Sequence, residues 1–235
     1  MTIADRVRNL AWGEIEASLS AFGYARTGAL LTADECASLA GLYDDDRRFR
    51  SRIDMARYRF GVGDYKYFDY PLPEIVEQLR VETYPRFAPI ANRWMEATGS
   101  EERFPQDLEA FHKRCRAAGQ TKPTPLLLHY EAGGYNCLHQ DLYGDLAFPL
   151  QLVCFLSRPN ADYTGGEFLL VEQRPRAQSV GEAVLPEQGE AIVFTTRYRP
   201  VKGSRGYYRV NMKHGVSRVK SGTRYTLGVI YHEAK

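Results

Sequence analysis

The 235-residue sequence lacks the long apolar runs of membrane and secreted proteins. Its longest apolar run, Leu146 to Leu156, is interrupted by Pro149 and Gln151. It falls far short of the roughly 20 residues that cross a bilayer. The first residues carry charge and no apolar segment precedes a small-residue cleavage site, so we expect no secretory signal. These absences predict a cytoplasmic protein with no membrane partner.

Paired cysteines are also missing. The sequence has four scattered cysteines and no CxxC motif: Cys36, Cys115, Cys137 and Cys154. A chain of this length can bury a sizeable core without disulfides. We therefore expect four reduced thiols, most of them buried, and the sequence assigns none of them a specific role.

Acidic residues are absent from one long segment. Between Ala191 and His232 there are nine Lys and Arg residues and no Asp or Glu, which gives the segment a charge of +9. The other residues hold 22 basic and 29 acidic groups, or −7, so the net charge of +2 hides a strong asymmetry. A basic segment of this kind favours an anionic ligand, either a phosphate backbone or a small dianion.

The composition, 44% apolar and 26% charged, is that of a globular protein. Residues 1–124 are mostly helical in pattern, with a hairpin rich in Arg and aromatic residues expected near 50–68. From residue 125 to 235, short apolar or β-branched runs alternate with glycine-containing turns. This pattern predicts an antiparallel sandwich or barrel, of which a jelly roll is one form. We expect an α+β protein that forms one compact unit.

Three helices are expected in the front region. Thr32 and Glu35 fit a capping box, in which a hydroxyl and a carboxylate cap the first turn reciprocally. Apolar residues recur at helical spacing over 73–94, where Pro85 and Pro89 predict a break or kink because each removes a backbone donor. A further helix is expected over 106–116.

A metal-binding pattern begins at His139-Gln140-Asp141. The first and third residues of an extended triplet point to the same side of the chain, so an imidazole and a carboxylate can reach one ion. This short motif is weak alone. His214 follows 75 residues later, and Arg224 opens the last expected strand ten residues beyond it. Two His and one carboxylate form the facial triad of non-haem Fe(II) enzymes, and a guanidinium suits a dicarboxylate ligand.

At these positions the sequence resembles the Fe(II)/2-oxoglutarate-dependent oxygenases. His139 lies nine residues after Tyr130, a spacing similar to that of prolyl hydroxylases and alkylation-repair dioxygenases. The segment 165–168, Gly-Gly-Glu-Phe, is similar to their turn into the next strand, and the spacing from His214 to Arg224 is prolyl-hydroxylase-like. The resemblance covers roughly 125–235. It implies a double-stranded β-helix (jelly-roll) core with the helical region 1–124 packed against it.

The resemblance also implies the site residues. The residues that would bind Fe(II) are His139, Asp141 and His214. Those that would bind the far carboxylate of 2-oxoglutarate are Arg224, Tyr130 and Thr226. The implied reaction uses O2, converts 2-oxoglutarate to succinate and hydroxylates a substrate, and ascorbate can support turnover. In this scheme the protein supplies ligand geometry and binding, whereas the cofactors supply the oxidation.

A finer resemblance is to a bacterial subgroup linked to oxidative repair of alkylated nucleic acid. It rests on the segments 139–145, 199–208 and 214–217. Leu128 and Ile230 stand where alkylation-repair enzymes carry an Asn and a second Arg, so the sequence departs from those enzymes. The implied reaction is demethylation of an alkylated nucleobase in DNA or RNA, with single-stranded or damaged nucleic acid as partner and DNA repair as the cellular role.

Basic and aromatic residues give this hypothesis physical support. They alternate over 197–209, a pattern that suits phosphate neutralisation and base stacking. A similar Arg/aromatic stretch over 47–60 is expected to form the opposite wall of the site. The candidate substrate contacts are Tyr143, Asp145, Arg197, Arg199 and Arg205.

Other functions remain open at this level. Exposed Arg/Tyr loops also bind acidic proteins, or serve only to attract the dianionic cosubstrate. The alternatives are a protein (prolyl-type) hydroxylase, a small-molecule hydroxylase and a non-catalytic nucleic-acid-binding jelly-roll module.

Four further polar residues carry weaker expectations. His129 alternates with Tyr130, so it is expected to face away from the cosubstrate as a structural histidine. Gln151, polar within an apolar run, is expected either to line the pocket or to close a backbone hydrogen bond. His112 and His232 are expected at the surface.

Overall fold

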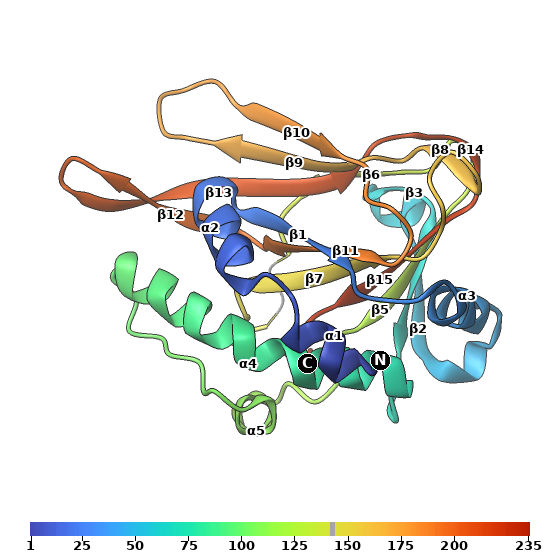
Figure 1. The fold of residues 1–235 in the computed structure, drawn as a ribbon, viewed down its shortest axis with the longest axis horizontal. Coiled ribbons are helices and arrows are strands. Elements are labelled where there is room, and N and C mark those ends of the chain that lie inside the picture. Colours follow the sequence, from blue (N-terminus) through green and yellow to red (C-terminus); the bar gives the residue numbers. More distant parts are fainter. Residues whose placement is uncertain (142–143) are drawn as a thin grey trace.

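Two antiparallel sheets lie face to face in the computed structural model, which describes residues 1–141 and 144–235 (Figure 1). Helices α1, α4 and α5 cover the outer face of the larger sheet, and both chain termini lie beside them (Figure 1). The protein therefore has the predicted α+β architecture, a jelly-roll core with a helical layer packed against it.

The larger sheet joins the front and back regions of the chain. Within the described ranges it has seven strands, in the order β1 (Tyr24–Ala29), β11 (Glu190–Thr195), β7 (Leu150–Phe155), β15 (Arg224–Val229), β5 (Leu126–Tyr130), β4 (Asp64–Phe68) and β2 (Phe49–Asp54). The expected hairpin near 50–68 corresponds to the antiparallel pair β2–β4, which extends the sheet beyond β5. Strand β1 forms the opposite edge. A division at residue 124 stays a prediction, since both regions contribute strands to one sheet.

The smaller sheet faces the larger one. Its order is β10 (Val180–Val184), β9 (Phe168–Gln173), β13 (Gly206–Val216), β6 (Tyr135–His139) and β3 (Gly61–Val62), and β12 (Tyr198–Gly203) pairs with the first part of β13. A short ladder joins β8 (Tyr163–Gly165) to β14 (Val219–Gly222). The β12–β13 hairpin projects from the sandwich (Figure 1).

The helices are α1 (Ile3–Arg8), α2 (Trp12–Phe22), α3 (Ala33–Gly41), α4 (Glu74–Ala97) and α5 (Leu108–Ala117), with single 3₁₀ turns at η1 (Leu42–Asp44), η2 (Asp46–Arg48) and η3 (Ala56–Tyr58). The predicted capping box is confirmed, because the Thr32 hydroxyl accepts from the Glu35 amide and the Glu35 carboxylate accepts from the Thr32 amide. The expected helix over 106–116 is α5, capped by the Asp107 carboxylate. No helix in the described parts of the chain has the length and apolar character needed to cross a membrane.

Helix α4 excludes a break at its prolines, one of the two expected outcomes, whereas a kink there stays a prediction. It runs through Pro85 and Pro89 as one helix. Pro89 cannot donate to the carbonyl of Pro85, but the side-chain amide of Gln106 donates to that carbonyl instead. The apolar face of α4, including Phe87 and Trp94, packs against the large sheet. This long-range packing and the substitute donor maintain a helix that local sequence disfavours.

Alternation along the strands separates two cores. On β7, Leu152 and Cys154 belong to the cluster with the helices, whereas Val153 and Phe155 belong to the cluster between the sheets. Successive side chains point to opposite faces of a sheet, so the inner face of each strand contributes every second residue. The four cysteines are free thiols, and only Cys137 is exposed, as expected.

Candidate metal and anion site

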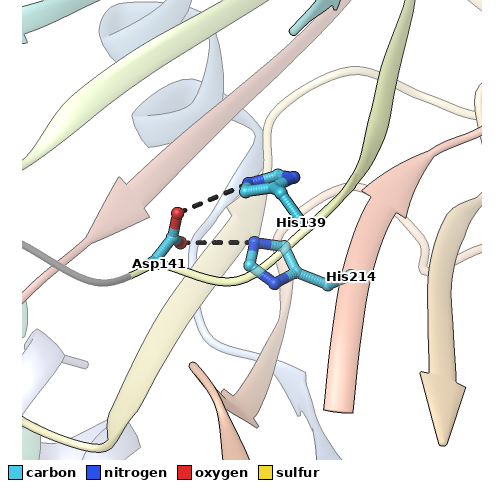
Figure 2. A group of neighbouring side chains, drawn as sticks. All are labelled: His139, Asp141 and His214. Carbon is cyan, nitrogen blue, oxygen red and sulfur yellow. Dashed lines mark ion pairs between the residues drawn. The ribbon is translucent and has the colours of Figure 1, made fainter. Parts of the chain in front are cut away.

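Strands β6 and β13 bring the predicted triad together between the sheets. His139 and His214 are direct cross-strand partners in the β6–β13 ladder. Asp141 lies two residues after His139, and both rings point toward its carboxylate (Figure 2). The Asp141 oxygens lie 3.4 Å from His139 Nε2 and 3.2 Å from His214 Nε2. One ligand atom from each residue lies within 4.8 Å of the others, so the group could hold one metal ion.

Hydrogen bonds orient the triad. His139 Nδ1 lies 2.7 Å from the backbone oxygen of Cys137 and donates to it, which leaves Nε2 facing Asp141 as the nitrogen available to a metal. Gln151 Nε2 donates to Asp141 Oδ2 at 2.6 Å. Such outer contacts fix the tautomer of an imidazole and the plane of a carboxylate before a metal binds.

Electrostatics favours the ligand form of Asp141 and His214. Burial alone would raise the pKa of Asp141, but His214 and His139 hold that pKa well below its usual range. Burial lowers the pKa of His214. For His139, burial opposes protonation, but the neighbouring Asp141 raises the pKa above its ordinary value. An ionised Asp141 and a neutral His214 are the states that bind a divalent metal.

Arg224 is buried among aromatic rings. The residue is 1% exposed, and Nε, Nη1 and Nη2 have no hydrogen-bond partner among the described residues. Aromatic rings surround its guanidinium carbon, at 5.4 Å for Phe155, 5.5 Å for Tyr130 and 5.9 Å for Tyr163. The buried hydroxyls of both tyrosines are likewise without partners there. Burial lowers the pKa of Arg224. An uncompensated buried cation is costly, so this arrangement fits an anionic ligand.

The space beside Arg224 depends on one glycine of a Gly-Gly turn. Gly165 and Gly166, in the predicted turn, have φ angles of 71° and 65°. A Cβ on Gly166 would lie 2.9 Å from Cδ of Arg224. Glycine adopts this left-handed conformation without strain, and here it also leaves space for the arginine side chain.

One cavity of about 440 Å³ connects the triad with Arg224. Its volume lies within the usual range for small-molecule sites. The larger sheet contributes alternate residues of β5, β15 and β7, namely Leu126, Leu128, Tyr130, Arg224, Thr226, Gly228, Gln151 and Val153. The triad lines the same cavity. Thr226, two residues after Arg224 on the same face of β15, is 2% exposed.

Part of the Arg/aromatic stretch over 47–60 reaches this cavity. Arg59 and Phe60 belong to its lining. The rings of Tyr58 and Phe60 stack at 5.6 Å with an interplanar angle of 20°, and each residue is about half exposed. Of the arginines in the stretch, Arg59 alone lines the cavity within the described residues. Arg47 and Arg52 instead pair with Asp45 and Asp64.

The five candidate substrate contacts are placed differently from the metal and anion residues. Tyr143 lies outside the described residues. Asp145 pairs with Lys235 at 2.8 Å, and Arg199 is 3% exposed and donates to Glu172 at 2.6 Å. Arg197 is exposed, as is Arg205 beside the β12–β13 turn. Among the described residues of this set, none belongs to the cavity lining, and their role in substrate contact stays a prediction.

The remaining histidine and glutamine expectations have mixed outcomes. His129 faces away from the cavity, pairs with Asp64 at 3.0 Å and stacks on Tyr225, which confirms a structural histidine. Gln151 lines the cavity, the first of its two expected roles. The surface placement of His112 and His232 is wrong, because they are 6% and 1% exposed. Both lie near the C-terminal segment, whose long-range packing has no local sequence signal.

Sequence reasoning missed several residues around Arg224 and the cavity. Phe155 and Tyr163 surround Arg224, and Tyr65 and Tyr67 line the cavity from β4. The alternation of Tyr65 and Tyr67 with Asp64 and Lys66 was the available signal for β4. Only the pairing of β4 with β5 identifies which side faces the cavity.

The donor set fits the two groups that the sequence resemblance implies. Two imidazoles and one ionised carboxylate match a facial Fe(II) site. The orphaned guanidinium of Arg224, with two tyrosine hydroxyls beside it, matches the carboxylate of 2-oxoglutarate.

Comparison with known proteins identifies the family. A model of the Oxygenase-NA family, described as "Oxygenase, catalysing oxidative methylation of damaged DNA", matches residues 63–234. An uncharacterized protein of Mycobacterium tuberculosis strain H37Rv is 52% identical over 167 residues, which cover 71% of this chain and 72% of that protein.

Solved structures share the fold. A Pseudomonas putida prolyl-4-hydroxylase has a TM-score of 0.58 at 16% identity, covering 96% of this chain and 100% of its own. A 2OG-Fe(II) oxygenase family oxidoreductase from Burkholderia pseudomallei has a TM-score of 0.53 at 15% identity, covering 95% and 92%. The chain shares its fold with a 2OG-Fe(II) oxygenase, and it belongs to the Oxygenase-NA family of enzymes.

Proposed function

We propose that this oxygenase removes a methyl group from an alkylated nucleobase in DNA or RNA. The observation that carries the proposal is a single cavity that joins the His–Asp–His triad, an unpaired buried Arg224 and an Arg/aromatic wall at Arg59 and Phe60. The family description, which refers to damaged DNA, supports the same substrate class.

The metal would be held by His139, Asp141 and His214. Because His139 Nδ1 is engaged by the Cys137 carbonyl, the ring is oriented to bind through Nε2. Gln151, on β7, would hold the Asp141 carboxylate in place. Three protein ligands on one side leave positions for the cosubstrate and dioxygen.

The cosubstrate would be bound through its far carboxylate by Arg224, Tyr130 and Thr226. A planar guanidinium can donate two parallel hydrogen bonds to a carboxylate, and Tyr130 and Thr226 contribute neighbouring hydroxyls on the same inner face. Binding would provide the hydrogen-bond partner that Arg224 lacks among the described residues. The same cavity walls limit the access of water to the reacting groups.

Bound Fe(II) and 2-oxoglutarate supply the oxidation, in which O2 is consumed, one oxygen atom enters succinate and the other hydroxylates the substrate, and CO2 is released. Hydroxylation of an N-methyl group gives N–CH2OH. This group releases formaldehyde as the proton of its hydroxyl moves to the ring nitrogen, leaving the unmethylated base. The chain's own contribution is to hold the base, the cosubstrate and the metal ligands in one geometry.

The wall at Arg59 suits a nucleic acid. Aromatic faces stack with bases irrespective of sequence, and the exposed Tyr58–Phe60 pair lies where the chain enters the cavity lining at Arg59. A base must leave its stack to reach a buried triad, so we expect a single strand or a flipped nucleotide. Asp145, Arg197, Arg199, Arg205 and Tyr143 remain proposed contacts with the surrounding strand.

The direct test is turnover with Fe(II), 2-oxoglutarate, ascorbate and a single-stranded oligonucleotide carrying an N-methylated base. We expect succinate and formaldehyde in equal amounts from the natural chain, and loss of both in His139→Ala. His129→Gln is the matched control, since His129 lies outside the cavity. Intact turnover in His139→Ala would overturn the metal assignment.

Two other outcomes would redirect the proposal. Succinate formation with a nuclease-treated protein extract, and none with oligonucleotides, would indicate a protein hydroxylase. Oligonucleotide binding that is salt-sensitive and needs no metal, with no succinate formed under any condition, would indicate a non-catalytic binding module.

A further inference from the structure

Tyr163 brings a buried hydroxyl to Arg224 from outside the two main sheets. The residue is 2% exposed, and its ring centre lies 5.9 Å from the guanidinium carbon of Arg224. Its hydroxyl has no hydrogen-bond partner among the described residues. The ring of Phe155 lies at a similar distance from that carbon, 5.4 Å, but its side chain is apolar. Of these two rings, only that of Tyr163 can therefore donate a hydrogen bond beside the guanidinium.

A two-stranded ladder holds Tyr163 in this place. Strand β8 begins at Tyr163 and pairs with β14, and both strands lie at the end of the sandwich opposite the β12–β13 hairpin (Figure 1). Val219 of β14 donates to the Gly134 carbonyl and accepts from the Gly133 amide, just after β5. Tyr163 and Val219 also share one apolar cluster with Tyr130. These contacts attach the ladder to the strand that carries Tyr130.

A ligand that binds Arg224 must reach the depth at which the Tyr163 hydroxyl lies. Arg224 lines the cavity, yet its guanidinium nitrogens are as fully buried as the hydroxyls of Tyr130 and Tyr163. A carboxylate in contact with the guanidinium therefore enters a layer of unpaired donors. Its two oxygens offer about four lone-pair sites, so it can accept from the guanidinium and from a hydroxyl at the same time.

The Tyr163 hydroxyl is suited to donate in this layer. Burial raises the pKa of Tyr163, and Arg224 offsets that rise only in part, so the phenol keeps its proton at neutral pH. A phenol oxygen can accept from a guanidinium while its O–H donates to a carboxylate. Because an unpaired buried hydroxyl is costly, a ligand that brings an acceptor removes that cost.

We propose that Tyr163 is a further cosubstrate-binding residue, whose hydroxyl donates to the far carboxylate of 2-oxoglutarate beside the guanidinium of Arg224. The proposal rests on the cosubstrate site of the proposed function. It extends that site from β5 and β15 to the β8–β14 ladder, so a segment outside the two main sheets contributes to cosubstrate affinity.

Two 2-oxo acids separate the far carboxylate from the rest of the cosubstrate. 2-Oxopentanoate has the same number of carbons as 2-oxoglutarate, but a methyl group replaces the far carboxylate. Each acid is titrated into the Co(II)-loaded chain, and the visible absorption of Co(II) reports binding. For Tyr163→Phe we expect the affinity for 2-oxoglutarate to fall by about 10- to 100-fold, as for a lost hydrogen bond to a charged group. The affinity for 2-oxopentanoate should stay level.

The ratio of the two affinities isolates the interaction between the hydroxyl and the carboxylate, because effects common to both acids cancel. Tyr225→Phe is the matched control. Tyr225 follows Arg224 on β15, but its ring stacks on His129 at 4.8 Å and lies outside the cavity lining. The ratio should be that of the natural chain in this control. An unchanged ratio in Tyr163→Phe, or an equal loss of affinity for both acids, would overturn the proposal.

Thermal unfolding gives a second readout with the opposite sign. Tyr163→Phe removes an unpaired buried hydroxyl and keeps the ring, so the unfolding temperature without ligand should stay level or rise. At a fixed concentration of 2-oxoglutarate, the variant should be stabilised less than the natural chain. A variant that is less stable without ligand, but gains as much from 2-oxoglutarate as the natural chain, would show that Tyr163 only packs against its neighbours.

Failure of the proposed function is distinguishable from failure of this inference. If the natural chain does not bind 2-oxoglutarate, the cosubstrate site and this inference are both wrong. If the natural chain binds it and Tyr163→Phe keeps the ratio, only the inference is wrong. The binding measurements need no oligonucleotide, so a natural chain that binds 2-oxoglutarate but fails to demethylate oligonucleotides would contradict the proposed function alone.

Discussion

Arg80 and Arg224 are both fully buried, yet their guanidinium groups have opposite surroundings. Arg80, on α4, donates to Glu233 at 2.8 Å and to the Tyr231 carbonyl at 3.2 Å. Arg224, on β15, has no hydrogen-bond partner for any of its three nitrogens within the described residues. One cation lies in the contact between the helical layer and the C-terminal segment, and the other lies in the cavity.

The pKa values follow the same division. Burial opposes the charge of Arg80, but Glu233 outweighs it and raises the pKa. Burial lowers the pKa of Arg224, and the nearby Tyr130, Tyr163 and Glu167 offset this effect only in part. A buried charge with a partner in the chain stabilises one packing arrangement, whereas a buried charge without one is arranged for a ligand. Variants of each group test this distinction.

The largest effect is expected at Arg224. The substitution Arg224→Met removes charge-assisted hydrogen bonds worth about 1.5–3 kcal/mol each, so affinity for 2-oxoglutarate should fall by about a hundredfold or more. Its unfolding temperature should stay level or rise, because an unpaired buried cation is lost. Thermal unfolding with and without 2-oxoglutarate checks both effects. A variant that retains the cosubstrate-dependent stabilisation would contradict the assignment of the anchor.

An effect of similar size, on stability, is expected when Arg80 loses its partner. Glu233→Gln leaves the buried guanidinium without a counter-charge, and breaking such a pair costs about 3–5 kcal/mol. Urea unfolding measures this change. The affinity for 2-oxoglutarate should stay level in the folded protein. If Glu233→Gln lost affinity for 2-oxoglutarate but kept the stability of the natural chain, Arg80 would have the same functional role as Arg224. That result would contradict the distinction between the two arginines.

A buried carboxylate extends the comparison to acid stability. Burial alone would raise the pKa of Asp64, but hydrogen bonds from His129, Tyr43 and Arg52 hold it at about 2. Its folded pKa lies below the unfolded value of about 3.9, so its contribution is complete above that pH and is lost as the pH falls toward 2. We expect the substitution Asp64→Asn to lower the free energy of unfolding by about 2 kcal/mol at neutral pH.

Comparing the free energies of unfolding of the natural chain and Asp64→Asn isolates this group from the other carboxylates. Measured by urea unfolding, the difference between the two free energies should narrow between about pH 4 and pH 2. A difference that stays constant over this range would contradict the role assigned to the charge of Asp64.

The smallest effect is expected at exposed arginines. Arg59→Gln should raise KM for a methylated oligonucleotide several-fold and reduce the slope of log affinity against log salt by about 0.7. Arg205→Gln should have a smaller effect on KM and on the salt slope, because Arg205 lies outside the cavity lining. Oligonucleotide binding at several salt concentrations measures both slopes. A larger effect of Arg205 would identify the β12–β13 hairpin as the main contact.

Local patterns in the sequence identified the three residues that the structure brings together as the triad. The spacing of His139 and Asp141 depends only on the two-residue period of an extended chain, and the placement of His129 opposite Tyr130 depends on the same period. The capping box at Thr32 is equally local. These features require no knowledge of distant contacts, which is why sequence reasoning identified them.

Predictions failed or stayed incomplete where a distant residue decides the outcome. Arg199 was expected at the substrate, but its bond to Glu172 holds β12 near β9. The break expected at Pro85 and Pro89 is overridden by Gln106 and by packing. His112 is buried because the C-terminal segment returns to α5. No local pattern encodes which residue will be the partner in such contacts.

The sequence by itself determined the donor set, the order of the metal ligands and the basic character of the last strands, because residue type and strand period are local properties. Only the tertiary structure decided which charges have partners. It places Glu233 against Arg80 and leaves Arg224 unpaired among the described residues. It also sets Gln151 against Asp141 across two strands. Because these groups are buried, the free energy of the protein differs strongly between a paired and an unpaired group. An unpaired polar group costs far more inside a protein than in water.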